Sequence, residues 1–235
     1  MFYTLSRFSR VHRALRKAAY SILWPTPRFI KEPLLHLYLG RRLPYSAVSL
    51  GDTVIQIGAP WDILKSGRSR FIHFLRKVGP HGRVVVIEPD AHNVKCLHEY
   101  VAKRGIKNLT IVPKGVWSSK TRLRFLSDPE NPASNLVEDV MDSKRTDYDR
   151  FNVSEIEVDT LDDIVDEVGC EKVALVSITS NGSENQILEG MAKLQENLVY
   201  IATIGEESLY PALSKYGYRR FGGDDRGYTF KKYLQ

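Results

Sequence analysis

Two apolar segments, residues 53–58 and 83–88, constrain the fold of this chain more than any other feature. One helix-length stretch separates them, and β-branched residues dominate both. The second segment does not alternate with polar residues, which is typical of a strand buried on both faces of a parallel sheet. The pair therefore predicts a strand–helix–strand unit in an α/β domain.

The same alternation continues along the chain. We predict further buried strands over 109–113, 172–178 and 198–204. Helices are predicted over 63–78, 91–104, 160–168, 184–196 and 206–215. Thr160 with Asp163, and Ser183 with Gln186, fit the capping pattern of helix N-termini.

The C-terminal segments 216–221 and 226–230 flank the sequence Gly-Gly-Asp-Asp at 222–225. Two strands around such a turn predict an antiparallel hairpin. A parallel α/β sheet that ends in an antiparallel hairpin resembles the class I S-adenosylmethionine methyltransferases.

A long polar insert, residues 127–152, separates two half-exposed strands predicted at 122–126 and 153–158. Inserts of this length in a compact domain are often functional, which predicts a lid or a substrate loop. Disorder is the alternative interpretation.

The net charge of +6 is unevenly distributed, because residues 1–50 carry nine Lys and Arg but one acid, Glu32. The rest of the chain is close to neutral, which argues against a nucleic-acid groove across the main domain. The two cysteines, Cys96 and Cys170, form no metal-binding pattern or disulfide framework. We therefore expect a cytoplasmic protein with no metal site.

We predict two parts, a basic N-terminal helical extension with a Pro-rich connector over 1–50 and an α/β domain over 51–235. Within residues 1–24 the apolar run at 18–24 is far shorter than the roughly 20 residues that span a bilayer. Basic residues recur there at helical spacing. They predict either a peripheral helix on an anionic membrane or partner, or an ordinary surface helix, and we favour the second.

Gly58 and Glu88 stand at the ends of the first two strands, where an adenosine-containing cofactor would need them. A residue without a side chain allows close approach of the backbone, and an acid can accept hydrogen bonds from ribose hydroxyls. Each residue alone could be a tight turn or a solvated strand end. Together in one strand–helix–strand unit they predict a nucleotide-type ligand.

Five segments, 51–59, 79–90, 108–118, 157–164 and 176–184, resemble the FkbM-type methyltransferases in order and spacing. The resemblance covers about residues 50–230. It implies a class I methyltransferase fold, Rossmann-like, with a seven-stranded, mostly parallel sheet and a C-terminal antiparallel hairpin. It also implies S-adenosyl-L-methionine as the cofactor and methylation of an oxygen of a small molecule or glycan.

The chain departs from the family pattern mainly in the site motifs. The family's first strand usually ends Asp-x-Gly-Ala-Asn-x-Gly, and here Gln56, Pro60 and Asp62 replace the acid, the Asn and the second Gly. In the family's later Lys-Ile-Asp-Val-Glu-Gly-Ala-Glu motif, Ser177, Thr179 and Asn181 replace the Lys, the Asp and the first Glu. Gly182 and Glu184 remain.

The cofactor contacts predicted from the resemblance are Gly58, Ala59, Asp62, Glu88, Pro89, Val116 and Trp117. Asp62 is a candidate partner for the ammonium group of the cofactor, while Trp117 stacks on adenine or is an ordinary core residue. Ser134-Asn135 resembles a family segment at the substrate mouth.

Glu184 is the preferred catalytic base, with a charge at a helix N-terminus as its alternative role. The other candidate bases are His73, His81 and Asp128.

Three functions are compatible with these patterns. The resemblance favours a methyltransferase, and the neutralised motif around Thr179 and Asn181 favours a non-catalytic relative that serves as a binding or interaction protein. A nicotinamide-dependent oxidoreductase is disfavoured, because the loop after Gly58 offers no second glycine for a pyrophosphate.

Overall fold

A computed structural model describes residues 28–61, 69–140, 148–204, 209–224 and 227–233. The chain divides into two units, residues 1–39 and 40–235. Each is described by itself.

In the first unit the structure describes one helix, α2 (Arg28–Leu39), which contains Pro33. The Pro-rich connector predicted within residues 1–50 is therefore helical at Pro33, since α2 continues through that residue. The helix predicted within residues 1–24, and its possible membrane contact, lie outside the described residues. Among the described helices, none has both the length and the apolar character needed to cross a bilayer.

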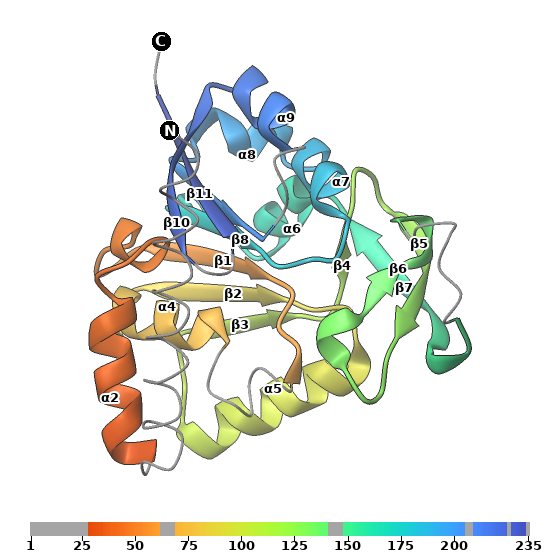
Figure 1. Ribbon diagram of the computed structural model, residues 1–235, viewed down its shortest axis with the longest axis horizontal. Coiled ribbons are helices and arrows are strands. Elements are labelled where there is room, and N and C mark those ends of the chain that lie inside the picture. The colour runs from red at the N-terminus through yellow and green to blue at the C-terminus, as the bar shows by residue number, and fades with distance from the viewer. Residues whose placement is uncertain (1–27, 62–68, 141–147, 205–208, 225–226, 234–235) are drawn as a thin grey trace, which may run out of the picture. The chain divides into compact units, whose positions relative to one another are not determined.

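A seven-stranded sheet forms the centre of the second unit, in the order β10-β11-β9-β8-β1-β2-β3 (Figure 1). Its strands are β1 (Thr53–Ile57), β2 (Arg83–Ile87), β3 (Leu109–Val112), β8 (Leu175–Ile178), β9 (Tyr200–Thr203), β10 (Tyr218–Asp224) and β11 (Gly227–Lys232). The five adjacent strands β9, β8, β1, β2 and β3 run parallel to one another, and β11 is antiparallel to both β9 and β10. The predicted class I methyltransferase fold is confirmed.

Helices cover both faces of this sheet. One face packs on α4 (Arg70–Val78) and α5 (Ala91–Arg104), which meet through the rings of Phe71 and Tyr100. The opposite face belongs to a core with side chains from α6 (Leu161–Glu167), α7 (Glu184–Glu189) and α9 (Tyr210–Lys215). Burial on both faces explains the uninterrupted apolar strands.

A smaller sheet, in the order β4-β7-β5-β6, lies beyond the arrowheads of β1, β2 and β3 (Figure 1). It consists of β4 (Gly115–Val116), β5 (Thr121–Ser127), β6 (Leu136–Val137) and β7 (Asn152–Asp159). The two half-exposed strands predicted from alternation are β5 and β7, which pair antiparallel along their whole length. The insert between them carries β6 and the short helices η2 (Pro132–Ser134), η3 (Glu138–Val140) and η4 (Tyr148–Arg150).

Three local predictions differ from the structure. The helix predicted over 184–196 is two helices, α7 and α8 (Ala192–Asn197). They are separated at Gly190, where the backbone of Trp117 packs so closely that a Cβ would overlap its carbonyl oxygen. Ser183 precedes α7 but its side chain makes no capping bond, whereas Thr160 accepts from the backbone of Asp163 at 3.0 Å. The Gly-rich segment predicted as a turn continues β10 as far as Asp224.

Residues 40–50, placed in the N-terminal extension by the sequence, belong to the second unit. Tyr45, in η1 (Tyr45–Ala47), is buried against the rings of His73 and Phe74 on α4. His73 is likewise buried in this core.

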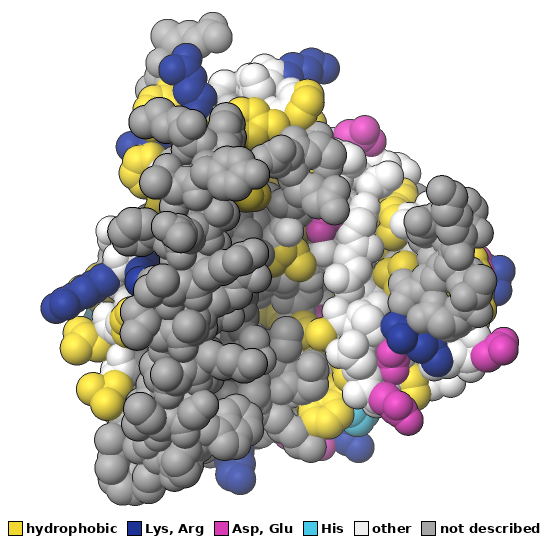
Figure 2. Space-filling view, viewed as in Figure 1, with side chains coloured by type: hydrophobic (Ala, Val, Ile, Leu, Met, Phe, Trp, Pro, Cys, Tyr) yellow, Lys and Arg dark blue, Asp and Glu magenta, His cyan; other side chains and the backbone are white. Residues whose placement is uncertain are grey.

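Seen from the same side in Figure 2, the described Lys and Arg side chains are scattered around the rim and do not gather into one patch.

Candidate cofactor site

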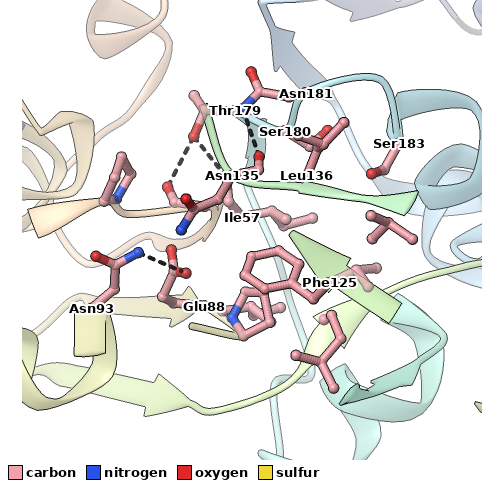
Figure 3. Close-up of a pocket in the computed structure, with 18 of the residues that line it drawn as sticks. Ile57, Glu88, Asn93, Phe125, Asn135, Leu136, Thr179, Ser180, Asn181 and Ser183 are labelled. Atoms are coloured by element: carbon pink, nitrogen blue, oxygen red, sulfur yellow. Dashed lines mark hydrogen bonds between the residues drawn. The ribbon is translucent and has the colours of Figure 1, made fainter. Parts of the chain in front are cut away.

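A pocket of about 80 Å³ lies where the carboxyl ends of β1, β2 and β8 meet the smaller sheet (Figure 3). Its inner wall includes Ile57, Glu88 and Thr179, which end or follow the three strands. Its outer wall comes from the smaller sheet and the insert, through residues such as Phe125 and Leu136. Parallel strands place their loops at this edge, where α/β sheets usually bind ligands.

Gly58 forms the turn that leaves β1 for the pocket. Its φ is +79°, and a Cβ there would overlap the carbonyl oxygen of Thr179 at the end of β8. Both the backbone conformation and the close approach therefore require glycine.

Glu88 joins the loops that follow β1 and β2. Its Oε2 accepts from the amide of Ala59 at 2.7 Å, and its Oε1 accepts from the amide of Asp90 at 3.1 Å and from Nδ2 of Asn93 at 3.2 Å. The side chain is only 4% exposed. Burial raises the pKa of Glu88 above its ordinary value, and the three hydrogen bonds oppose this shift without cancelling it.

Asn93 completes this junction, and the sequence analysis missed it. It is 1% exposed, bonds Glu88, and accepts from the amide of Trp61 at 3.1 Å. The feature of the sequence that could have identified Asn93 is its position three residues after Asp90. The Asp90 carboxylate caps α5 by accepting from the Asn93 amide. A buried asparagine in a first helical turn needs such partners.

Gln56 and Thr179, two of the departures from the family pattern, contact each other. Nε2 of Gln56 lies 2.8 Å from Oγ1 of Thr179 and 3.0 Å from the carbonyl oxygens of Ile57 and Gly58. Gln56 is 1% exposed, on β1 next to Ser177 of β8. The two replacements thus form one hydrogen-bonded unit at the sheet edge.

Asn181 ties the loop after β8 to the insert. Its Nδ2 donates to the carbonyl oxygens of Ala133 at 2.8 Å and Asn135 at 2.7 Å. Asn135 lines the pocket, whereas its neighbour Ser134 bonds Asp128 and Asn131.

Asp128 organises the first turn of the insert. It is 5% exposed, accepts from the amides of Glu130 and Asn131 and from the hydroxyl of Ser134, and forms an ion pair with Arg150 at 3.4 Å. Burial raises the pKa of Asp128, but these partners outweigh it and hold the pKa below its ordinary value. Such a carboxylate is a weak base and serves structure here.

The structure brings four of the predicted cofactor residues to the pocket lining, namely Gly58, Glu88, Pro89 and Val116. Ala59 contributes its backbone amide to Glu88. Trp117 packs with the core of the smaller sheet instead of lining the pocket. Asp62 lies outside the described residues.

None of the four candidate bases lines the described pocket. Glu184 is buried in the first turn of α7, next to Ser183, which does line it. His81 is exposed in the turn before β2, at the amino end of the sheet.

The titratable groups among the described lining residues are Glu88 and Lys114. The contact with Glu167 raises the pKa of Lys114, which therefore remains protonated. Cys96 and Cys170 form no disulfide, and the described residues contain no His, Cys, Asp or Glu cluster that could hold a metal ion.

The profile of the methyltransferase FkbM domain matches residues 56–218, more than half of the chain. The chain belongs to the FkbM methyltransferase family. This match confirms the resemblance found in the sequence. It also supports the predicted cofactor, S-adenosyl-L-methionine, which is the cofactor of this class.

Solved structures with a similar fold include a methyltransferase FkbM from Methylobacillus flagellatus KT, with 18% identity and a TM-score of 0.48. The match covers 77% of this chain and 43% of that protein, so the chain spans less than half of its length. Fibrillarin from Aeropyrum pernix, solved with natively bound S-adenosyl-L-methionine, has 14% identity and a TM-score of 0.47 over 85% of this chain and 73% of that one. No curated protein matches this FkbM family member.

The nucleoside end of the cofactor fits the residues present. Each carboxylate oxygen has two lone pairs, and Oε2 of Glu88 uses one of them for Ala59, so it can still accept from a ribose hydroxyl. The cavity, however, is smaller than the roughly 300–1,000 Å³ of small-molecule sites.

Proposed function

We propose that this FkbM family member is an active methyltransferase that methylates an oxygen of a small molecule or glycan. The observation that carries the proposal is the bond between the Glu88 carboxylate and the Ala59 amide at 2.7 Å. It joins the acid at the end of β2 to the glycine turn at the end of β1, with Gly58 and Glu88 both facing the pocket. The substrate class comes from the family resemblance.

We assign Gly58, Glu88, Pro89 and Val116 to cofactor binding. The cofactor supplies a methyl group on a sulfonium, which is transferred by in-line displacement, so the protein's main task is to position donor and acceptor. The strand-end residues hold the nucleoside end, and the apolar side chains of Phe125, Leu136 and their neighbours exclude water. Glu184, the chain neighbour of the lining residue Ser183, remains the proposed base.

We further propose that the segment 132–137 of the insert is a lid. It forms the outer wall of the pocket, and Asn181 holds it to the β8 loop through two hydrogen bonds. Opening these bonds would widen a cavity that is otherwise too small for the cofactor.

Replacing Asn181 with Ala is expected to loosen the lid while leaving the fold intact. Asn181 is exposed, and each bond lost contributes about 0.5–1.5 kcal/mol. Hydrogen exchange should accelerate over 132–137, and cofactor association should become faster. Asn197→Ala, at an exposed position on α8, is the matched control and should change neither. Unchanged exchange in Asn181→Ala would contradict the lid.

Cofactor affinity is expected to fall as the solution is acidified, because a protonated Glu88 accepts a hydrogen bond from a ribose hydroxyl more weakly than the charged carboxylate does. Because the pKa of Glu88 is raised, this loss of affinity begins at a higher pH than it would for an ordinary glutamate. The depressed pKa of Asp128 keeps that residue ionised in the same range, so its contribution to stability is lost only at lower pH. Calorimetry with S-adenosylhomocysteine, with unfolding followed in parallel, should therefore show affinity declining before stability.

The absence of any binding at millimolar ligand would refute the enzyme proposal and leave the non-catalytic alternative. If binding is found, methyl release from labelled cofactor in the presence of candidate alcohol acceptors tests catalysis directly.

A further inference from the structure

The amide of Gln56 saturates the hydrogen-bond acceptors at the carboxyl end of β1. Its Nε2 contacts the carbonyl oxygens of Ile57 and Gly58 and the hydroxyl of Thr179, all within 3.0 Å. The Thr179 hydroxyl itself lies 2.8 Å from the Ile57 oxygen and 2.9 Å from the Gly58 oxygen. Ile57, Gly58 and Thr179 are pocket-lining residues, and Figure 3 shows bonds of Thr179 beside Ile57.

The contacts fix the orientation of this amide. If it were reversed, Oε1 would face two carbonyl oxygens at 3.0 Å, and acceptors repel each other. In the observed orientation Oε1 is buried and has no hydrogen-bond partner among the described residues. This orientation leaves a buried acceptor unsatisfied while the amide group donates to the end of β1. A hydrogen-bond donor is therefore favoured over an acceptor at this place.

An amino-acid group has the opposite needs. Its ammonium requires acceptors, preferably a carboxylate, and burying it without one is costly. At the carboxyl end of β1 the amide of Gln56 already donates to the acceptors that an ammonium would need.

The two charged groups among the described lining residues do not supply that partner. Glu88 is assigned to the nucleoside end, where Ala59, Asp90 and Asn93 donate to its carboxylate and the remaining lone pair of Oε2 would accept from a ribose hydroxyl. Lys114 is itself a cation, held by Glu167 and Asp159.

We propose that the pocket recognises the nucleoside half of its ligand and gains little from the amino-acid half, with Gln56 and Thr179 as the residues that set this preference. The inference rests on the proposed function, since it assumes that the pocket binds an adenosine thioether. It predicts that neutral nucleoside thioethers without an amino-acid tail are ligands, and therefore competitors of the cofactor. The earlier prediction that Asp62 pairs with the ammonium leads to the opposite result.

The test compares two probes on the full chain by calorimetry, S-adenosylhomocysteine and methylthioadenosine, which share the nucleoside and differ in the tail. We expect their dissociation constants to agree within about threefold. If S-adenosylhomocysteine binds about thirtyfold or more tightly, the inference is overturned while the proposed function stands. If neither probe binds, both fail.

A variant tests the assignment to Gln56. Gln56→Glu keeps the shape but places a carboxylate oxygen beside the two carbonyls, where an ammonium could bridge them. We expect the preference for S-adenosylhomocysteine over methylthioadenosine to rise by about tenfold.

Gln195→Glu is the matched control, because Gln195 is also 1% exposed and its Oε1 has no partner among the described residues, but it lies on α8 and not at the carboxyl end of β1. It reports the cost of a buried acid and should leave the preference unchanged. An unchanged preference in folded Gln56→Glu would remove Gln56 from the assignment.

Discussion

Gly58→Ala should lower the free energy of unfolding by about 2–5 kcal/mol and abolish cofactor binding. Two costs combine at this position. A side chain at φ +79° strains the backbone by about 1–2 kcal/mol, and its Cβ would overlap the carbonyl oxygen of Thr179. Because that oxygen belongs to the backbone of the neighbouring strand end, relief requires β1 and β8 to separate. Denaturant unfolding and calorimetry with S-adenosylhomocysteine measure the two effects.

Gly51→Ala is the control that separates the costs. Gly51 also has a positive φ, +85°, but a Cβ there would meet no atom within 4 Å. It should therefore show the backbone strain alone and leave ligand binding intact. Equal losses of stability in the two variants would mean that the contact with Thr179 costs nothing, and the role assigned to Gly58 would be wrong.

The central sheet was predictable because its signals are local. Strand β2 carries an uninterrupted β-branched run and β1 a run broken by Gln56 alone, and α5 was predicted at its observed bounds because Asp90 and Gly105 delimit it. Gly58 and Glu88 could be assigned from position alone, since parallel strands bring their carboxyl ends to one edge.

The errors arose where distant contacts decide the structure. Gly190 interrupts a helical pattern because the backbone of Trp117, far away in sequence, packs against it. Pro33 is an error of a different, local kind, because it stays within α2 although proline lacks the amide that would bond the preceding turn.

Side-chain pairing within the site could not be predicted either. Gln56 and Thr179 looked like two independent losses of charge, whereas they are 123 positions apart and share a hydrogen bond. Asn181 likewise looked like a neutralised acid, and its bonds to the insert depend on the path of that loop. Periodicity contains no information about such pairs, because it describes one element at a time.

Glu88→Ala should destabilise the fold as well as weaken binding. The substitution leaves three buried donors, the amides of Ala59 and Asp90 and Nδ2 of Asn93, without their acceptor. Each orphaned donor costs about 1–3 kcal/mol. Removing the charge recovers part of this lost stability. The raised pKa of Glu88 shows that its hydrogen bonds do not fully compensate the cost of burying the carboxylate. We expect the donors to dominate, with a net loss of about 2–5 kcal/mol in urea unfolding.

Glu157→Ala sets the baseline for this measurement. Glu157 is exposed and pairs with the exposed Arg122 at 3.2 Å, so its loss should cost at most about 1 kcal/mol. A similar small effect in Glu88→Ala would mean that the junction between the two loops is dispensable.

Glu88→Gln then distinguishes the two roles of the residue. It retains one acceptor oxygen for the Ala59 amide, so the junction should be weakened less than in Glu88→Ala, but it removes the charge that would receive a ribose hydroxyl. If Glu88 contacts the cofactor directly, affinity for S-adenosylhomocysteine should fall by about tenfold or more even though most of the stability returns, and its dependence on pH should disappear. If affinity instead recovers together with stability, Glu88 acts only by holding the loop after β1 in place, and the acid at the end of β2 is a positioning residue.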